Sequence, residues 1–479
     1  MQAFDNPPPP PATGQAQDAS PLFTGPRHLL AERLERGRQL RKRIPRKDQA
    51  LYPPVRTRRS PLELIRQQNG SRVEKLVPIR NARMRVSPFA FFRGNAAIMA
   101  GDLAAATPVT GIDVFACGDM HVANFGVFAS AERNLIFAIN DFDEVHPGPW
   151  EWDLKRLVAS AAIAARHLGG DDTDAAEAAR AAAGGYRYHI REYARMGYLD
   201  TWYDCIDEQA ILQALPGRAR ERARKVLGKA RTRGHVRTLE RMTETVDGRL
   251  RILESPPLIV RETHRPDGTP VALGMDLTLR SYMESLDAQI RFLLSRFRIV
   301  DVARKVVGVG SVGTSCWVSM LLGADDEEPL FLQVKEAQPS VLAAHLPGRS
   351  PFANEGQRVV AGQRLIQGSP DIFLGWGNGG HDFYVRQLAD VKGGISLEEG
   401  DRGTLDGFPA YCGLCGWALA LAHAKSGDAA LIAGYCGSSE ALDEALAGFA
   451  LAYERQNASD YERFVAACRR GAFRCEKSA

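Results

Sequence analysis

Two short apolar runs, each followed directly by polar residues, stand out in the first third of the chain. Gly111–Cys117 (GIDVFAC) and Leu135–Ile139 (LIFAI) have the length and apolar content of buried strands. The first run leads into GDMHVANFG and the second into NDFDE. Leu154–Leu168 is a longer, Ala-rich apolar segment, which predicts a core helix. The pattern therefore predicts two polar loops at strand ends, followed by a buried helix.

Helical patterns fill most of the remaining chain up to residue 300. The segment from Asp174 to about Gly234 continues as helix, and Leu277–Phe297 predicts another. Between them, the proline pair in ESPPLIV breaks regular structure. Two further helices, Leu414–Ala424 and Glu440–Tyr453, are predicted near the C-terminus, and the last residues are polar.

From Asp301 the pattern becomes that of strands. The run ARKVVGVGSVGTSCWVSMLLG is rich in β-branched residues and contains Gly308, Gly310 and Gly313. We expect a strand over Thr314–Leu322 and a second at PLFLQVKEA, which carries Lys335. An ammonium group in an apolar strand is costly without a partner. Lys335 therefore predicts an anion nearby.

A helix and one more strand follow the lysine strand. Asn354–Gln367 predicts a helix whose only acid, Glu355, stands at its start. Phe383–Leu388 predicts a strand that leads toward a linker.

These changes of pattern divide the chain into four parts with an α+β fold. We expect a disordered, basic tail over residues 1–60 and a helix-rich part with both polar loops over 61–300. A small β-rich part over 301–395 and helices over 396–479, which complete the larger part, would follow.

Composition and charge narrow the class of protein. The 479 residues are 45% hydrophobic and 25% charged, which is ordinary for a soluble protein with a sizeable core. The formal net charge is only +4, and twelve Lys or Arg are concentrated between Arg27 and Arg59. This basic stretch is the part of the chain that could contact nucleic acid or anionic lipid. We favour the simpler interpretation that it is a solvated helix and tail.

Cysteines and targeting signals point to the cytoplasm. The eight cysteines are scattered, and Cys412 and Cys415 form a CxxC pair without a second pair or a histidine at zinc spacing. We interpret them as small buried residues in a reducing compartment. The N-terminus lacks the regions of a signal peptide. No uninterrupted apolar run approaches the roughly 18 residues of a membrane span.

The two polar loops carry the side chains of a phosphate-handling site. Asp119 and Asn124 lie in the first loop, and Asp141 and Asp143 lie in the second. One carboxylate can accept the proton of an attacking hydroxyl, while an amide and a further acid can hold a divalent cation. The simpler alternative is that Asp119 and Asp141 cap turns.

Two other polar residues near these loops allow more than one role. We expect His121 to pack within its loop rather than to act in chemistry. Arg93 lies in SPFAFFRGN, between aromatic residues and a glycine. It would either meet a phosphate or pair with a buried acid.

The glycine run fits two kinds of nucleotide site. A Rossmann site needs a helix that opens within the run, and one acid about twenty residues later. A kinase places the run between two strands and follows it with a strand that carries lysine. Because we expect a strand after Gly313, we favour the second interpretation. A plain β-hairpin with a surface lysine is the simplest alternative.

These motifs resemble those of kinase-like phosphotransferases. GDMHVANFG is similar to the catalytic loop of aminoglycoside and choline phosphotransferases (typically GDLHPGN), and INDFDE to their metal-binding IDFxD. Asp153-Leu154 resembles the buried Asp-Leu that steadies this loop, and LALAHA resembles the helix that normally leads into it. The resemblance implies a two-lobe kinase-like fold that is circularly permuted, because the glycine run follows the catalytic loop.

Residues 60 to 470 also resemble an uncharacterised bacterial family, domain of unknown function 2252. The shared stretches include SPFAFFRG, GDMHVANFGVF and NDFDEVHPGPWEWDLKRL. This resemblance identifies relatives without an activity.

The kinase resemblance implies an ATP- and magnesium-dependent phosphotransferase that acts on a hydroxyl of an unknown small molecule or protein. Asp119 would accept the hydroxyl proton, and Lys335 would neutralise phosphates cradled by the glycine run. The metal ligands would be Asn124, Asp141 and Asp143. Two alternatives are a kinase-like regulatory module that binds nucleotide and works through a protein partner, and an enzyme that transfers AMP.

Overall fold

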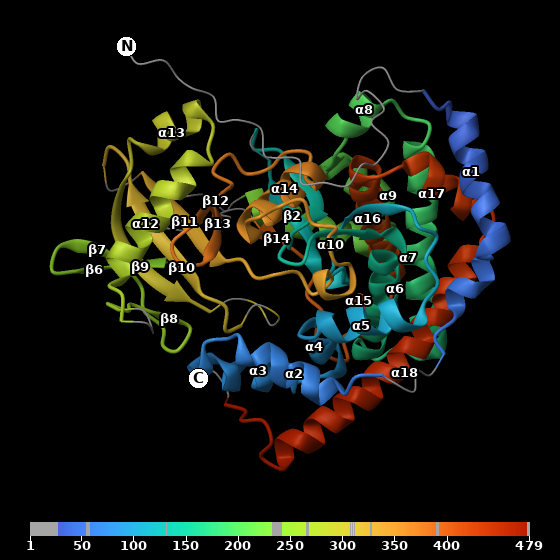
Figure 1. The fold of residues 1–479 in the computed structure, drawn as a ribbon, viewed down its shortest axis with the longest axis horizontal. Coiled ribbons are helices and arrows are strands. Elements are labelled where there is room, and N and C mark those ends of the chain that lie inside the picture. The colour runs from blue at the N-terminus through green and yellow to red at the C-terminus, as the bar shows by residue number, and fades with distance from the viewer. Residues whose placement is uncertain are drawn as a thin grey trace.

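The structure, a computed structural model, has a smaller part built on a six-stranded sheet and a larger part that is mostly helical (Figure 1). It describes residues 27–476 except 54–57, 131, 232–241, 265–267, 307, 309, 311, 326–327 and 389–391. The mixture of helices and strands confirms the α+β class. The prediction for residues 1–26 lies outside the described residues.

The smaller part is built on an antiparallel sheet with the strand order β12-β13-β11-β10-β9-β8 (Figure 1). Its strands are β8 (Ile259–Val260), β9 (Arg298–Lys305), β10 (Cys316–Leu322), β11 (Pro329–Glu336), β12 (Gly375–Asn378) and β13 (Asp382–Gln387). Helices α12 (Val271–Glu284) and α13 (Ala288–Leu294) cover one face, where Tyr282 and Leu294 pack in one cluster with Trp317 of β10. A hairpin of β6 (Thr243–Val246) and β7 (Arg249–Ile252) lies beside β9.

The glycine run lies between two strands of this sheet. β9 ends at Lys305 and β10 begins at Cys316, so the segment after Gly313 is a strand, as predicted. This excludes the Rossmann interpretation, which needs a helix there. Lys335 lies on β11 as expected and is buried.

The larger part is helical and has α6 (Trp150–His167) and α16 (Phe408–Ser426) near its centre (Figure 1). α7 (Asp172–Tyr193) contacts both, and α18 (Ala441–Arg469) packs along α6 and α7. Shorter helices complete this part: α8 (Tyr198–Tyr203), α9 (Glu208–Ala214), α10 (Gly217–Arg231), α15 (Arg402–Leu405) and α17 (Ala429–Cys436). The predicted helices at residues 154–168 and 414–424 are confirmed.

Two helix predictions were wrong: the end of the last helix, and the single helix expected over residues 277–297. We expected the last helix to end near Tyr453, but α18 continues to Arg469, because Phe464 and Ala467 pack in a cluster with Phe91. The segment 277–297 forms two helices, since α12 ends at Glu284 and α13 begins at Ala288.

Short strands hold the two polar loops in place. β1 (Asp113–Ala116) pairs with β4 (His146–Pro149). β2 (Phe125–Ala129) and β3 (Leu135–Ile139) pair in a sheet with the order β14-β2-β3-β5, which includes β5 (Ile206–Asp207) and β14 (Lys392–Gly393). Both strands predicted at residues 111–117 and 135–139 are present, and the second has the predicted bounds.

Helices also form near the N-terminus, within and after the expected tail. α1 (Leu30–Arg43) packs closely on α17, where a Cβ at Gly37 would collide with the carbonyl of Leu431. This part of the basic stretch is therefore a packed helix rather than a tail. The following helices are α2 (Pro61–Gly70), α3 (Val77–Met84), α4 (Pro88–Arg93) and α5 (Ala96–Ala106).

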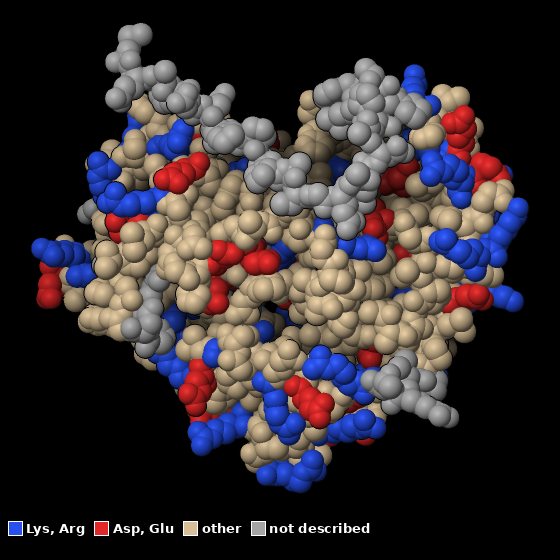
Figure 2. Space-filling model, in the orientation of Figure 1, with Lys and Arg blue, Asp and Glu red and all other residues tan. Residues whose placement is uncertain are grey.

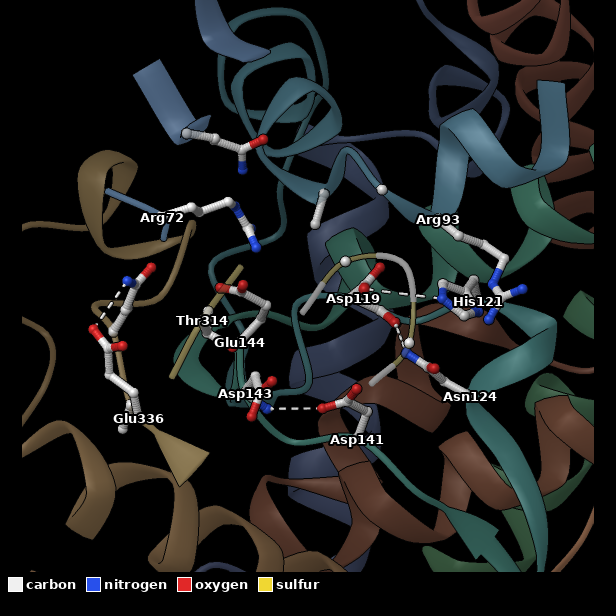
Figure 3. Close-up of a pocket in the computed structure, with 17 residues that line it drawn as sticks. Arg72, Arg93, Asp119, His121, Asn124, Asp141, Asp143, Glu144, Thr314 and Glu336 are labelled. Carbon is white, nitrogen blue, oxygen red and sulfur yellow. Dashed lines mark hydrogen bonds and ion pairs between the residues drawn. The ribbon is translucent and has the colours of Figure 1, made fainter. Parts of the chain in front are cut away.

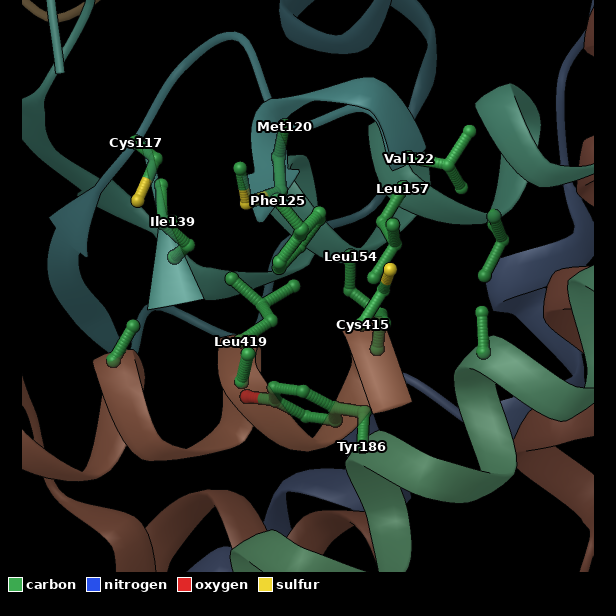
Figure 4. Close-up of a cluster of buried hydrophobic side chains, with 14 of the residues drawn as sticks. Cys117, Met120, Val122, Phe125, Ile139, Leu154, Leu157, Tyr186, Cys415 and Leu419 are labelled. Carbon is green, nitrogen blue, oxygen red and sulfur yellow. The ribbon is translucent and has the colours of Figure 1, made fainter. Parts of the chain in front are cut away.

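The main core lies directly beneath the first polar loop. Figure 4 shows Met120, Val122 and Phe125 of this loop near Leu154 and Leu157 of α6, all of them buried. Cys412 and Cys415 are buried in the same core, and burial raises the pKa of both thiols well above the ordinary value. The interpretation of the CxxC pair as small core residues is consistent with this packing.

On the face of the molecule shown in Figure 2, basic and acidic side chains are mixed around the rim, and neither sign forms one large patch. Within the described residues, we find no helix that combines the length and the apolar character needed to cross a membrane.

Candidate functional site

A cavity lies where the small sheet meets the helical part, and both polar loops line it (Figure 3). It encloses about 110 Å³. The predicted site residues on its wall are Asp119, Asn124, Asp141, Asp143, Gly308 and Gly310. Segments far apart in the sequence therefore meet at one place.

The first loop makes a sharp turn that Asp153 holds in place. Gly118 has a φ of +75°, and a Cβ there would lie 2.5 Å from the carbonyl oxygen of Glu144, so only glycine fits. The Asp153 carboxylate accepts hydrogen bonds from the backbone N–H groups of Cys117, at 2.5 Å, and Gly118, at 2.9 Å. The predicted structural role of Asp153 is confirmed.

Arg156, one turn further along α6, orients the carboxylate of Asp119. Its Nε donates to Oδ1 of Asp119 at 2.8 Å, and its Nη2 donates to the same oxygen and to the carbonyl of Phe92. Asp153 and Arg156 thus act from the same face of one helix, because residues three apart are neighbours on a helix surface. We did not predict this role of Arg156, although the spacing in WDLKRL carried the signal.

Strand pairing brings the second loop beside the first. β2 and β3 are antiparallel with Phe125 opposite Ile139, so Asn124 and Asn140 stand at the same end of the pair. The N–H of Asn140 donates to the carbonyl of Asn124 at 2.9 Å. The Asn124 side chain donates in turn to the carbonyl of Asp119 at 2.7 Å. Asn124 therefore connects the two acidic loops.

The carboxylate of Asp141 has lone pairs that its protein neighbours leave unused. Among the described residues, its one hydrogen bond comes from the N–H of Asp143 at 3.3 Å. Burial, and then the neighbouring Asp143, raise its pKa. Lys335 and Arg386 offset this rise only in part, and Asp141 forms no ion pair with a described residue. A partly buried carboxylate with unused oxygen lone pairs fits a divalent cation, which would supply further positive charge.

Lys335 reaches this acidic pair from the sheet. Its ammonium group pairs with Oδ2 of Asp143, and the hydroxyl of Tyr384 donates to Oδ1 of the same carboxylate at 2.7 Å. Tyr384 lies directly opposite Lys335 on the neighbouring strand β13. Burial lowers the pKa of Lys335, but Asp143, Tyr384 and Asp141 outweigh it and raise that pKa well above the ordinary value.

The helix after the lysine strand does not supply the partner of Lys335. α14 (Glu355–Ile366) forms where we predicted it, but Glu355 pairs with Arg358. Arg358 is buried and donates to the carbonyls of Val145, Asp143 and Gln338. In this structure Asp143 takes the position beside Lys335, and the predicted metal role of Asp143 would use the lone pairs that Lys335 and Tyr384 leave.

The glycine loop lies close over Asp119. Gly308 and Gly313 have φ values of +67° and +96°, a region that favours glycine. A Cβ at Gly310 would lie 3.4 Å from the carbonyl of Arg93 and 4.0 Å from Oδ2 of Asp119. The loop is tied to the α2–α3 segment, since the N–H of Val73 donates to the carbonyl of Gly313 at 2.8 Å.

His121 and the arginines of the cavity complete the site. His121 is buried, and burial followed by the charges of Arg93 and Arg156 lowers its pKa well below the ordinary value, so it packs as a neutral ring. Arg93 lines the cavity and forms no ion pair with a described carboxylate. Arg72, Arg358 and Tyr384 were not predicted, because their partners come from distant segments.

Comparison with known proteins gives a family but no activity. A family of uncharacterised proteins conserved in bacteria (DUF2252) matches residues 72–467, and the chain belongs to it. Neither the curated proteins nor the solved structures contain a match.

Proposed function

We propose that this protein is an ATP- and magnesium-dependent phosphotransferase of the kinase-like class. The observation that carries the proposal is the pairing of buried Lys335 with Asp143, which lines the cavity together with Asp141 and Asn124. Lys335 and Gly313 themselves do not line the cavity as it stands. In kinases, a lysine on a strand after the glycine loop and an acid from a separate loop meet at the nucleotide phosphates. The acceptor is a hydroxyl of a small molecule or protein.

The arrangement of elements supports a permuted two-lobe fold. The glycine loop, the lysine strand and α14 follow one another along the chain as in a kinase small lobe. α16, which resembles the helix that leads into the catalytic loop, packs against that loop: Tyr411 donates to the carbonyl of Val122 at 2.8 Å, and His423 lies 3.4 Å from Asp153. A chain cut between this helix and the loop would produce the observed order.

The nucleotide would enter between the glycine loop and the acidic loops. A cavity of about 110 Å³ is smaller than the roughly 300 Å³ or more of typical ligand pockets. The glycine loop therefore has to move away from Asp119 on binding. Its N–H groups would then bind phosphate oxygens, and Lys335 would neutralise their charge.

Asn124 and Asp141 would hold the magnesium ion, with Asp143 as a further ligand. Magnesium commonly uses one or two carboxylates and completes its shell with water and phosphate oxygens. Within the described residues, no cluster of three or more His, Cys, Asp or Glu forms a metal cage, so water and phosphate oxygens would have to complete the shell. The ion would neutralise charge on the phosphates.

Asp119 is placed to accept the proton of the acceptor hydroxyl. As the acceptor oxygen forms its bond to the γ-phosphorus, the bond from that phosphorus to the ADP oxygen breaks and the hydroxyl proton passes to the Asp119 carboxylate. Arg156 holds Oδ1 of Asp119, while Oδ2 lies 3.9 Å from Nε2 of His121 and near Gly310, which also lines the cavity. The pairing therefore orients the base.

The alternatives use the same residues. The lack of an α14 acid beside Lys335 favours a nucleotide-binding regulatory module, and transfer of AMP would need the same acids.

A thermal-shift series tests nucleotide binding first. ATP with magnesium should raise the melting temperature more than ATP alone, and NAD should not. Stabilisation by NAD alone, or by none of these, would reject the proposal. ATP labelled at the γ or the α phosphate then distinguishes transfer of phosphate from transfer of AMP.

Asp119→Asn tests the proposed base. Turnover should fall roughly 10²- to 10⁴-fold with nucleotide binding retained. Asp113→Asn is a matched control, because Asp113 lies on β1 outside the cavity and pairs with exposed Arg349. Full turnover by Asp119→Asn would remove the base from the mechanism.

A further inference from the structure

Helix α14 contacts the second polar loop near both ends of that loop. Gln367, which follows the helix directly, donates from its side-chain amide to the carbonyl of Ile139 at 2.8 Å. Near the start of the helix, Arg358 donates to the carbonyl of Asp143 at 3.0 Å and to that of Val145 at 2.5 Å. Ile139 immediately precedes the loop, so the helix holds this segment at its beginning and at its end.

The side chain of Arg358 connects three segments and is only 1% exposed. Its Nη2 also donates at 2.8 Å to the carbonyl of Gln338, which lies shortly after the lysine strand β11. Its Nε donates to Glu355, one turn earlier on the helix. A guanidinium group has five donors in fixed directions, so it can hold several carbonyls in one arrangement. Arg358 therefore fixes the backbone of the loop relative to the helix and to the end of the lysine strand.

Close packing leaves α14 little room to shift. A Cβ at Gly362 would lie 2.6 Å from Cγ1 of Val145, and a Cβ at Gly356 would lie 2.2 Å from the carbonyl oxygen of Phe383 on β13. Side chains do not fit at such distances, so both positions require glycine. The helix is thereby a closely packed link between the sheet that carries Lys335 and the loop that carries the acids.

The backbone that Arg358 holds also sets the position of the Asp143 carboxylate. Its Oδ2 pairs with Lys335, and its Oδ1 accepts from Tyr384. The carbonyl of the same residue accepts from Arg358. Without Arg358, three carbonyls would lose a donor at a buried place, and unpaired buried polar groups are unfavourable. The loop would then shift toward water and carry Asp141 and Asp143 with it.

We propose that Arg358 is a positioning residue of the site, which holds residues 143–145 so that Asp141 and Asp143 face the place where magnesium and phosphate would bind. It does not touch the reacting groups itself. The helix that follows the lysine strand thus positions the partner of Lys335 through a backbone contact instead of supplying an acid. The catalytic part of this role rests on the proposed function, whereas the hold on the loop does not.

Hydrogen exchange without nucleotide tests the hold on the loop. Arg358→Gln should raise the exchange rates of backbone N–H groups in residues 140–146 roughly 10-fold or more, read by mass spectrometry under native conditions, and leave those of α6 unchanged. Arg364→Gln is the matched control, because Arg364 lies on the same helix and donates to the carbonyl of Leu374 at 2.6 Å rather than to the loop. Loop exchange in Arg358→Gln equal to that of wild type would overturn the proposal.

Magnesium dependence tests the role in the proposed reaction. Removing a partner that orients a metal ligand commonly costs roughly 10- to 100-fold in metal affinity or activity. The magnesium concentration for half-maximal turnover should therefore rise by a similar factor in Arg358→Gln, and kcat should change more than the KM for ATP. Arg358→Lys keeps the charge and one donor group, so it should recover part of both losses. A wild-type magnesium requirement and kcat in Arg358→Gln would overturn the positioning role.

Glu355→Gln separates this role from that of a helix acid. It removes the only acid of α14 but leaves the three carbonyl contacts of Arg358, so loop exchange and magnesium dependence should stay near wild type. Effects as large as those of Arg358→Gln would overturn the proposal.

Two further outcomes keep the proposal distinct from the stability of the fold and from the proposed function. If Arg358→Gln does not fold, Arg358→Lys replaces it in both measurements, and it should still raise loop exchange because it loses the forked donors; no change would overturn the proposal. Faster loop exchange in Arg358→Gln, with no nucleotide binding by wild type, would reject the proposed function and support the hold on the loop.

Discussion

Two buried lysines, Lys335 on β11 and Lys155 on α6, have opposite electrostatic settings. Lys335 pairs with Asp143, and its pKa is raised well above the ordinary value. The Nζ of Lys155 has no hydrogen-bond partner among the described residues and lies 4.8 Å from the ring centre of Phe449. Burial lowers its pKa to about 7 against the attraction of Glu151.

The two lysines also differ in where their acidic neighbours come from: a distant segment for Lys335, and the same helix for Lys155. Lys335 and Asp143 lie far apart in the chain, and their contact joins the sheet to the acidic loops. Glu151 and Lys155 lie one turn apart on α6, deep in the core, where burial also raises the pKa of Glu151 to about 7. The first contact lies beside the proposed nucleotide site, whereas the second places two poorly solvated charged groups in the core.

The same substitution at both lysines gives the largest expected contrast. Lys335→Met removes the ion-pair partner of the partly buried Asp143 and should cost at most roughly 3–5 kcal/mol of unfolding free energy, because the Asp143 side chain is 26% exposed. It should also lower turnover about 10²- to 10³-fold, as loss of a preorganised cation does. Lys155→Met should leave turnover unchanged. Denaturant unfolding and a γ-phosphate assay measure both, and equal loss of stability in the two variants would contradict the comparison.

Removing the helix pair altogether should stabilise the protein. The double variant Glu151→Gln, Lys155→Met replaces two poorly solvated charges, and buried pairs replaced in this way are often neutral or gain about 1–4 kcal/mol. Urea unfolding at pH 7 checks the gain. A clear loss of stability would show that the pair contributes a favourable interaction.

The gain in stability of the double variant over the wild type should depend on pH. The folded pKa of Lys155 is lowered from 10.5 to about 7, so stability of the wild type should rise as the pH increases through this interval. The folded pKa of Glu151 is raised from 4.5 to about 7, so stability should fall between those values. The advantage of the double variant should therefore be greatest near pH 7 and smaller at pH 5 and pH 9.5. A flat difference across this range would contradict the assignment.

The smallest effect is expected at Tyr384. Tyr384→Phe removes the hydroxyl that donates to Asp143 at 2.7 Å but leaves the ring and the Lys335 pair. We expect a loss of about 0.5–1.5 kcal/mol, measured by denaturant unfolding. A loss as large as that of Lys335→Met would mean that the hydroxyl, not the lysine, dominates the setting of Asp143.

Local patterns predicted the elements and the loops of the site, because apolar run lengths and glycine positions are local properties. The strand Leu135–Ile139 and the strand position of Lys335 followed from such runs. The partner of Lys335 did not, since it depends on how the sheet meets the loops. The pairing of Glu355 with Arg358 and the inward direction of Arg72 depend likewise on tertiary packing.

Calorimetric titration of ATP with magnesium into wild type, Lys335→Met and Lys155→Met tests the central claim most directly. If the cavity is a nucleotide site, wild type and Lys155→Met should bind with the same affinity, and Lys335→Met should bind far more weakly or not at all. Equal affinity in all three proteins would show that the nucleotide, if it binds, does so away from Lys335 and the acidic loops.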